Sequence, residues 1–210
     1  MVDAMTYITE YRKSAMPLPG FRQKYQDREK YMTYCRECPN YGTVWSCPPL
    51  SFEVEEYLSG FAWVNILCAK IILSDRTIAE ADTPEKIKSV GWEMLLAVKL
   101  GMEEKLRHLE KALPGSVSLS SGSCNLCSAC SRKDGKPCRQ PDKMRYSLDA
   151  FGFDLSAITK DMFAIDILWC KDRLPDYFTL IHGILTKDEM PADLWDSLGL
   201  KFAEVHNEAV

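Results

Sequence analysis

Two groups of cysteines constrain how this chain can fold. Seven of its nine cysteines fall into two short segments. The first group has the spacing C-x2-C-x8-C and contains Cys35, Cys38 and Cys47. The second has the spacing C-x2-C-x2-C-x7-C and contains Cys124, Cys127, Cys130 and Cys138. Because the odd total fits poorly with complete disulfide pairing, metal binding is the better explanation of such clusters. We predict two cysteine-rich metal-binding loops, at residues 34–50 and 121–147.

The second group favours an iron–sulfur cluster. Its short intervals let one loop bring three thiolates toward neighbouring irons, and a C-x2-C-x2-C start is typical of bacterial ferredoxin loops. The fourth cysteine, Cys138, follows after a longer excursion that can still close on the same cluster. Zinc usually takes its cysteines as separated pairs. We therefore predict a [4Fe–4S] cluster at this group, with zinc as the alternative.

Positive charge surrounds the second group. Residues 131–145 contain six Lys or Arg and two Asp, a local charge of +4 in a chain whose net charge is −4. Nearby cations stabilise a negatively charged cluster. We predict that Arg139 and Arg145 bind the cofactor or a small anionic ligand, because they flank Cys138 and the next helix. The other cations at the start of this segment are predicted to be solvated: Arg132, Lys133 and Lys136.

The first group is one thiolate short of a complete four-cysteine site. One explanation is a cluster with one iron open to a small ligand, which would make this the reactive site of an enzyme. Another is a fourth ligand from elsewhere: Cys68, Cys170, a histidine or a carboxylate. A third is a zinc ion completed in the same way, and a fourth is a packed loop without metal. The spacing leaves these alternatives open.

The remaining cysteines and the histidines carry weaker signals. Cys68 and Cys170 lie in or after apolar segments and are predicted to be ordinary buried thiols. His108 and His182 fall in regular elements, but no spacing singles them out as ligands. His206, near the end of the chain, is predicted to be solvated.

The pattern of apolar residues predicts a mixed α+β fold of one domain, residues 1–210, with a small mixed or antiparallel sheet and packed helices. The clearest element is a helix over residues 84–113, with apolar residues every three or four positions and Pro84 in its first turn. Strands are predicted at 62–73, 116–119 and 177–185. Further helices are predicted before residue 34 (two, separated by a turn), at 52–59, at 147–158 with a break near Gly152, and in the last 20 residues. Residues 163–169 fit a helix or a strand.

Composition and the absence of other motifs narrow the function. The net charge of −4 argues against general nucleic-acid binding and against attachment to an anionic membrane. No run approaches the roughly 18 apolar residues of a membrane span, and the first residues lack the apolar stretch of a signal peptide. We therefore expect a cytoplasmic protein. The phosphate-binding, hydrolase and metalloprotease motifs are also missing, so no catalytic residue is assigned.

Both cysteine segments resemble a known family. The stretches CRECPNYGTVWSCPP and SGSCNLCSACSRKDGKPCRQPDKMRYSLDAFGFDL, with the patterns C-x2-C-x8-C-P-P and C-x2-C-x2-C-x7-C-R-x-P, are similar to a prokaryotic family of predicted metal-binding proteins, a domain of unknown function. The resemblance extends from about residue 34 to residue 185. It implies metal binding through all seven clustered cysteines, and it implies no particular reaction.

These observations lead to three functional hypotheses. The first is an iron–sulfur protein with one or two clusters that transfers electrons, or serves as an accessory to a redox enzyme, with a redox partner protein. The second is a zinc-stabilised binding protein without catalytic activity. The third is an enzyme that uses the open iron of a three-cysteine cluster.

Overall fold

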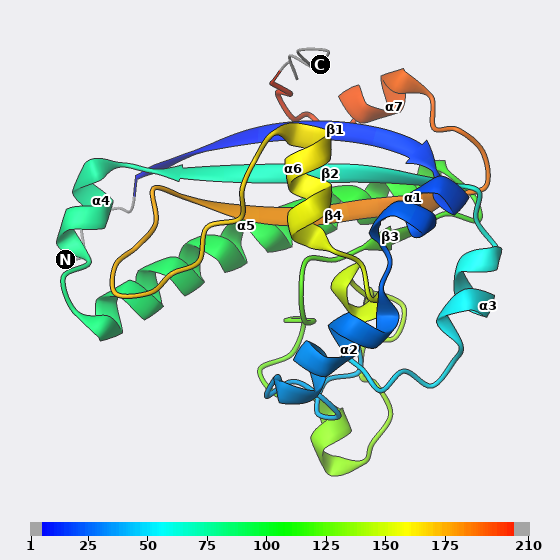
Figure 1. The fold of residues 1–210 in the computed structure, drawn as a ribbon, viewed down its shortest axis with the longest axis horizontal. Helices are drawn as coiled ribbons and strands as arrows, with labels where there is room; N and C mark the ends of the chain where they lie inside the picture. Colours follow the sequence, from blue (N-terminus) through cyan, green and yellow to red (C-terminus); the bar gives the residue numbers. More distant parts are fainter. Residues whose placement is uncertain (1–5, 204–210) are drawn as a thin grey trace.

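A four-stranded antiparallel sheet forms the centre of the fold (Figure 1). The structure, a computed structural model, describes residues 6–203. The strands lie in the order β1-β2-β4-β3, and each neighbouring pair is antiparallel. Their bounds are β1 (Tyr7–Pro17), β2 (Trp63–Leu73), β3 (Val117–Leu119) and β4 (Tyr177–Thr186). The predicted α+β class with an antiparallel sheet is confirmed.

Helices cover both faces of this sheet. The long helix α5 runs along one face, and α6 lies against the other (Figure 1). The α-helices are α1 (Leu18–Tyr25), α2 (Arg28–Glu37), α3 (Val54–Ser59), α4 (Asp75–Glu80), α5 (Pro84–Ala112), α6 (Leu155–Phe163) and α7 (Ala192–Asp196). Two short 3-10 turns are η1 (Ser131–Asp134) and η2 (Asp149–Phe151). None of the helices between residues 6 and 203 is both long enough and apolar enough to cross a lipid bilayer.

Strand β2 is buried on both faces and therefore separates two cores. Successive side chains of a strand point to opposite faces. Leu67 and Ile71 accordingly pack in the core beneath α5, whereas Ile66 and Cys68 pack in the core that α1, α3 and α6 share. Cys68 is fully buried in this second core, as predicted.

Helix α5 confirms the clearest sequence prediction. The Thr83 side chain accepts a hydrogen bond from the Lys86 backbone N–H at its start, and Pro84 occupies the first turn. The buried residues of its apolar stripe are Ile87, Met94, Val98, Met102, Leu106 and Leu109. Full burial of such a side chain stabilises a fold by about 1.5–3 kcal/mol, so this stripe secures α5 to the sheet.

The prediction of a first helix near the N-terminus is wrong, because that segment is the edge strand β1. Its polar side chains suggested a surface helix, but an edge strand is also half exposed and tolerates charge. Tyr7 and Tyr11 pack on the core beneath α5. Pro17 ends the strand and Pro19 lies in the first turn of α1, where a missing N–H costs little.

The other differences lie in the last third of the chain. Residues 165–170 form neither a helix nor a strand, and Cys170 is exposed instead of buried. Of the helix predicted over the last 20 residues, the part that the structure describes, up to residue 203, contains the five residues of α7. The segment predicted to be helical at 147–158 contains η2 and the start of α6, and the predicted break near Gly152 is confirmed. His206 lies outside the described residues.

The fold brings the two cysteine loops to the same side of the sheet. Helix α2 leads into the first loop, and β3 leads into the second (Figure 1). Ser120 and Ser147 form a bridge that closes the base of the second loop. The Asp27 backbone N–H donates to the Gly152 carbonyl at 2.9 Å, so the start of α2 is held by residues that follow the second loop.

Candidate metal centres

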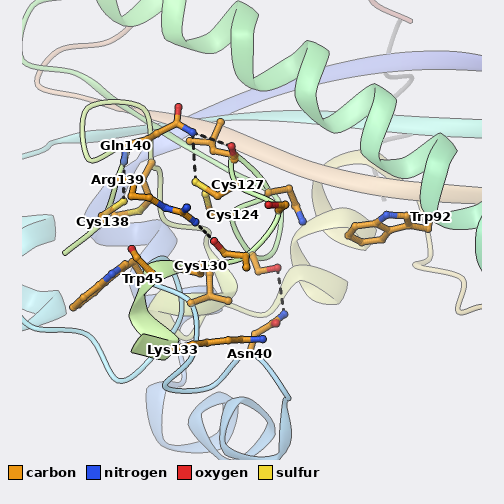
Figure 2. Close-up of a pocket in the computed structure, with 18 residues that line it drawn as sticks. Asn40, Trp45, Trp92, Cys124, Cys127, Cys130, Lys133, Cys138, Arg139 and Gln140 are labelled. Atoms are coloured by element: carbon orange, nitrogen blue, oxygen red, sulfur yellow. Dashed lines mark hydrogen bonds between the residues drawn. The ribbon is translucent and has the colours of Figure 1, made fainter. Parts of the chain in front are cut away.

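The four cysteines of the second group line one cavity. This cavity has a volume of about 260 Å³, and Cys124, Cys127, Cys130 and Cys138 all contribute to its wall (Figure 2). Trp45 from the first loop and Trp92 from α5 also line it. The structure therefore brings together the four residues that the spacing predicted as one ligand set.

Gln140 directs N–H groups at two of these sulfurs (Figure 2). Its backbone N–H lies 3.4 Å from Cys138 Sγ, and its side-chain Nε2 lies 3.5 Å from Cys127 Sγ. The same Nε2 also donates to the Leu126 carbonyl at 2.8 Å. Hydrogen bonds to the sulfurs are one of the means by which a protein sets the potential of an iron–sulfur centre.

The three cysteines of the first group line a second cavity. Its volume is about 200 Å³, and its wall includes Cys35, Cys38 and Cys47. Cys35 lies in the last turn of α2, and Cys38 caps this helix, its N–H donating to the Cys35 carbonyl at 3.1 Å. Asp149 of η2 lies on the same wall. The two cysteine cavities adjoin, because Asn40 and Ser123 line both of them.

Direct hydrogen bonds hold the two loops together. The Asn40 side-chain amide donates to Ser123 Oγ at 3.2 Å, and the Cys124 backbone N–H donates to Ser46 Oγ at 2.8 Å. The Trp45 indole N–H donates to the Lys136 carbonyl at 3.1 Å. Neither loop could move far without breaking these contacts, so the two cavities keep a fixed relation.

Arg132 also connects the two loops, and the prediction that it is a solvated charge is wrong. Its guanidinium donates to three backbone carbonyls of the first loop, those of Val44, Cys47 and Pro49, at 2.7–2.9 Å. The group also stacks on the Trp45 ring, 5.0 Å from the ring centroid. A planar guanidinium with five donors suits such a cluster of acceptors, which a lysine could not match.

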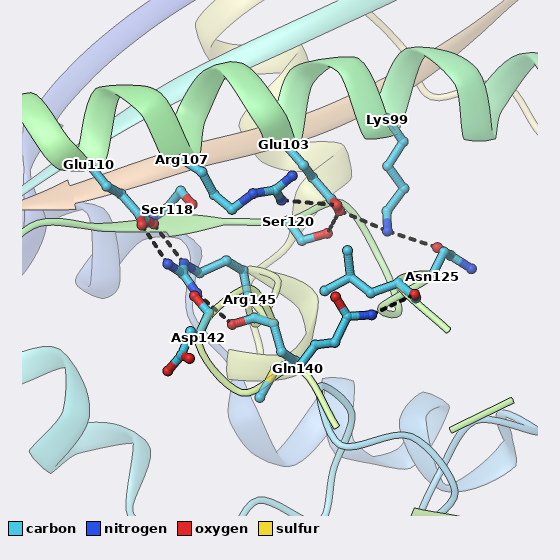
Figure 3. A network of polar contacts seen from close by, with 12 residues as sticks. Lys99, Glu103, Arg107, Glu110, Ser118, Ser120, Asn125, Gln140, Asp142 and Arg145 are labelled. Atoms are coloured by element: carbon cyan, nitrogen blue, oxygen red, sulfur yellow. Dashed lines mark hydrogen bonds and ion pairs between the residues drawn. The ribbon is translucent and has the colours of Figure 1, made fainter. Parts of the chain in front are cut away.

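A buried ion pair on α5 also contacts and supports the second loop (Figure 3). Lys99 Nζ lies 2.9 Å from Glu103 Oε1, and both side chains are less than a tenth exposed. Lys99 also donates to the Ser123 carbonyl at 2.7 Å and to Asn125 Oδ1 at 2.8 Å. Helix α5 thus holds both neighbours of Cys124.

The two arginines that were predicted to bind a cofactor or anion have different surroundings. Arg139 lies on the wall of the larger cavity and donates to the Ala129 carbonyl of its own loop. Arg145 lines neither cysteine cavity, and its guanidinium pairs with Glu110 of α5 (Figure 3). Burial favours a higher pKa for Glu110, but hydrogen bonds from Arg145 and Ser118 outweigh it and lower this pKa. A cofactor contact by either arginine stays a prediction.

Burial raises the pKa of three of the cysteine thiols and so makes them harder to deprotonate. It raises the pKa of Cys47 to about 12, and it raises the pKa of Cys35, helped by the negative charge of Asp149. The pKa of Cys124 is also raised by burial, although the Leu126 N–H and the Lys99 ammonium oppose this. A thiolate is the form that binds metal. Metal binding at these sites would therefore release protons and be favoured by higher pH.

The spacing of the donor side chains bears on the kind of metal centre that they could hold. Among residues 6–203, no three Cys, His, Asp or Glu side chains converge closely enough to hold one metal ion. The larger cavity is many times the roughly 30 Å³ that one water molecule occupies in the liquid. A cluster places its own irons and sulfides between the thiolates, so its ligands stand further apart than those of zinc.

Several of these residues carried only weak sequence signals. Lys99 and Glu103 fall at an i, i+4 spacing on the apolar side of α5, which could have indicated a buried pair. Gln140, Ser46 and Asp149 belong to no recognisable motif, and the Ser46 contact to the Cys124 N–H joins residues that are 78 positions apart. Only the packed loops reveal them.

The comparisons with known proteins agree with the metal-binding character of these loops. A comparison of the chain with curated proteins found no match, and a comparison with solved structures found none. The family model described as predicted metal-binding protein (DUF2284) matches residues 22–185, well over half of the chain, and this range contains both cysteine groups. The chain therefore belongs to the DUF2284 family of predicted metal-binding proteins.

Proposed function

We propose that this protein is an iron–sulfur electron carrier, or an electron-transferring accessory of a redox enzyme. The first centre is a [4Fe–4S] cluster held by Cys124, Cys127, Cys130 and Cys138. The second is held by Cys35, Cys38 and Cys47.

The observation that carries this proposal is the shared wall of the two cysteine cavities. Asn40 and Ser123 line both cavities and are hydrogen bonded to each other. Electron tunnelling falls steeply with distance, so two centres that adjoin are suited to pass electrons between them. A protein that used metal only to stabilise its fold would not require this adjacency.

Positive charges beside the larger cavity favour a redox partner with an acidic surface. Exposed cations cluster in the second loop, and they are Lys133, Lys136, Arg139 and Lys143. A patch of one sign raises the association rate of partners of the opposite sign, and salt weakens this effect. The reduced protein should therefore pass electrons faster to an anionic oxidant such as ferricyanide than to a cationic cobalt ammine complex, and added salt should reduce this difference.

The decisive experiment is a metal and sulfide analysis of protein purified without oxygen. We expect iron and acid-labile sulfide in equal amounts, a brown colour that dithionite bleaches, and a paramagnetic signal after reduction. Cys127→Ser should lower the iron content and change this signal. Cys170→Ser is the matched control, because Cys170 is an exposed cysteine that lines neither cysteine cavity.

Two results would overturn the proposal. Colourless protein with stoichiometric zinc would identify the zinc-stabilised binding protein instead. Iron and sulfide in a protein that no reductant or oxidant can titrate reversibly would exclude electron transfer while leaving the cluster in place.

A further inference from the structure

We propose that the Asp149 carboxylate is the fourth protein ligand of the centre at Cys35, Cys38 and Cys47. This inference rests on the proposed iron–sulfur function and completes its second site. It gives that site three soft thiolates and one hard oxygen donor, and hence one iron that differs from the others.

The first observation is the wall of the smaller cavity. Asp149 lines it together with the three cysteines, and it is the one carboxylate among the described residues that do so. The other polar side chains on this wall carry no charge of their own: Asn40, Tyr41, Ser123 and Ser147.

The second observation is an unpaired atom. Asp149 Oδ1 is buried and has no hydrogen-bond partner within the described part of the chain. A buried carboxylate oxygen without a partner is costly, so such an atom calls for a ligand or an ion. Coordination to a metal in the adjoining cavity would satisfy it.

The third observation is that the backbone holds Asp149 in a fixed position relative to the cysteines. The Gly152 N–H donates to the Asp149 carbonyl at 3.0 Å within η2. The Gly152 carbonyl in turn accepts from the Asp27 N–H at the start of α2. Because α2 carries Cys35 and Cys38 at its other end, the carboxylate and these two thiols belong to one packed unit.

The other candidate ligands lie elsewhere. Cys68 is fully buried in the core of the sheet among apolar side chains. Cys170 is exposed and lines a different pocket, between α5 and β4. His182 is fully buried in β4, and His108 is exposed on α5. None of these four lines the smaller cavity.

An oxygen-ligated iron has a distinct chemistry. Carboxylate is a harder ligand than thiolate and is less suited to hold iron in a sulfur cluster. This iron should therefore exchange its ligand and leave more readily than its neighbours. Its loss as Fe²⁺ converts [4Fe–4S]²⁺ to [3Fe–4S]⁰ without electron transfer. One electron taken by added ferricyanide then gives [3Fe–4S]⁺, which has a characteristic paramagnetic signal.

The test compares three variants of the whole chain, each loaded with iron and sulfide without oxygen. Asp149→Ala should lose one iron per chain and show the three-iron signal after oxidation. Asp149→Cys should keep all its iron and hold it longer than the wild type against a chelator. Asp134→Ala is the matched control, because Asp134 is an exposed acid of the other cysteine loop and lines neither cavity.

The outcomes separate this inference from the proposed function. Wild-type protein without iron and sulfide would overturn the proposed function. If the wild type carries both clusters but Asp149→Ala retains every iron, Asp149 is not a ligand and only this inference fails. If Asp149→Ala does not fold, Asp149→Cys decides: a chelator lability equal to that of the wild type refutes the assignment.

Discussion

Replacing Gly152 by alanine should destabilise the protein far more than a glycine substitution in a loop usually does. Gly152 has a φ of +83°, and a Cβ built on it would lie 2.7 Å from Arg28 Cα and 2.9 Å from Arg28 Cγ. The close atom is backbone, which cannot turn aside as a flexible side chain would. The substitution therefore introduces a strained conformation and pushes α2 away from η2.

The magnitude follows from these two effects. The left-handed conformation costs a residue with a Cβ about 1–2 kcal/mol, and forced overpacking costs about 1–3 kcal/mol. We expect Gly152→Ala to lower the free energy of unfolding by about 2–5 kcal/mol in total. Gly199→Ala is the matched control, since Gly199 has a φ of +62° and its nearest neighbour would be Lys105 Nζ at 3.9 Å. The control should show only the conformational cost.

The assay is urea unfolding followed by far-ultraviolet circular dichroism, on both variants and the wild type, without oxygen. Equal m-values would show that the change lies in stability and not in the extent of unfolding. If the two variants lose the same free energy, Gly152 does not pack against α2 as the structure has it, and the argument is refuted.

Three further predictions concern polar side chains that are buried or lie between the two loops. Burial, and then the charge of Lys99, lower the pKa of His182 to about 3. As the pH falls below about 6.5, the unfolded chain therefore takes up a proton at His182 before the folded protein does, and the free energy of unfolding drops by about 1.4 kcal/mol per pH unit. His182→Leu should make the urea midpoint depend less on pH between pH 7 and 5. An unchanged pH dependence of the midpoint would contradict this. Arg132→Lys should lose hydrogen bonds to backbone carbonyls and lower the stability by about 1–3 kcal/mol, measured by thermal unfolding. Lys133→Gln, at an exposed neighbouring residue, should change the stability little. Equal losses of stability in the two variants would refute the role of Arg132. Lys99→Met should cost about 3–5 kcal/mol because it removes the nearer of the two cations that pair with the buried Glu103 carboxylate. Combining it with Glu103→Gln should cost less than the sum of the two single changes. Strict additivity would show that the pair does not interact.

Local patterns were sufficient for much of the architecture. The apolar stripe of α5 and the apolar runs of β2 and β4 were recognised because each element buries a face whose period is visible in the chain. The edge strand β1 was missed for the opposite reason. Half of its surface meets solvent, so its polar residues imitate a surface helix, and only pairing with β2 makes it a strand.

In the candidate site, too, some residues could be predicted from local patterns and others could not. The cysteine spacings alone were enough to predict both groups of candidate ligands, because closely spaced thiols in one loop form a pattern that is visible in the sequence. Arg132 and Asp149 could not be recognised in this way. Arg132 acts on carbonyls more than 80 residues away in the chain, and Asp149 reaches the first cysteines only through the packing of η2 on α2.

The sequence by itself thus determined the family, the grouping of the cysteines that are predicted to be ligands, and the basic character of the second loop. The tertiary structure decided how those groups relate to one another. It placed the two cavities side by side, buried Lys99 beneath the second loop and directed a carboxylate to the first. The physical reason is that ligand type and local spacing are properties of short segments, whereas burial, unpaired atoms and shared walls arise only when distant segments pack together.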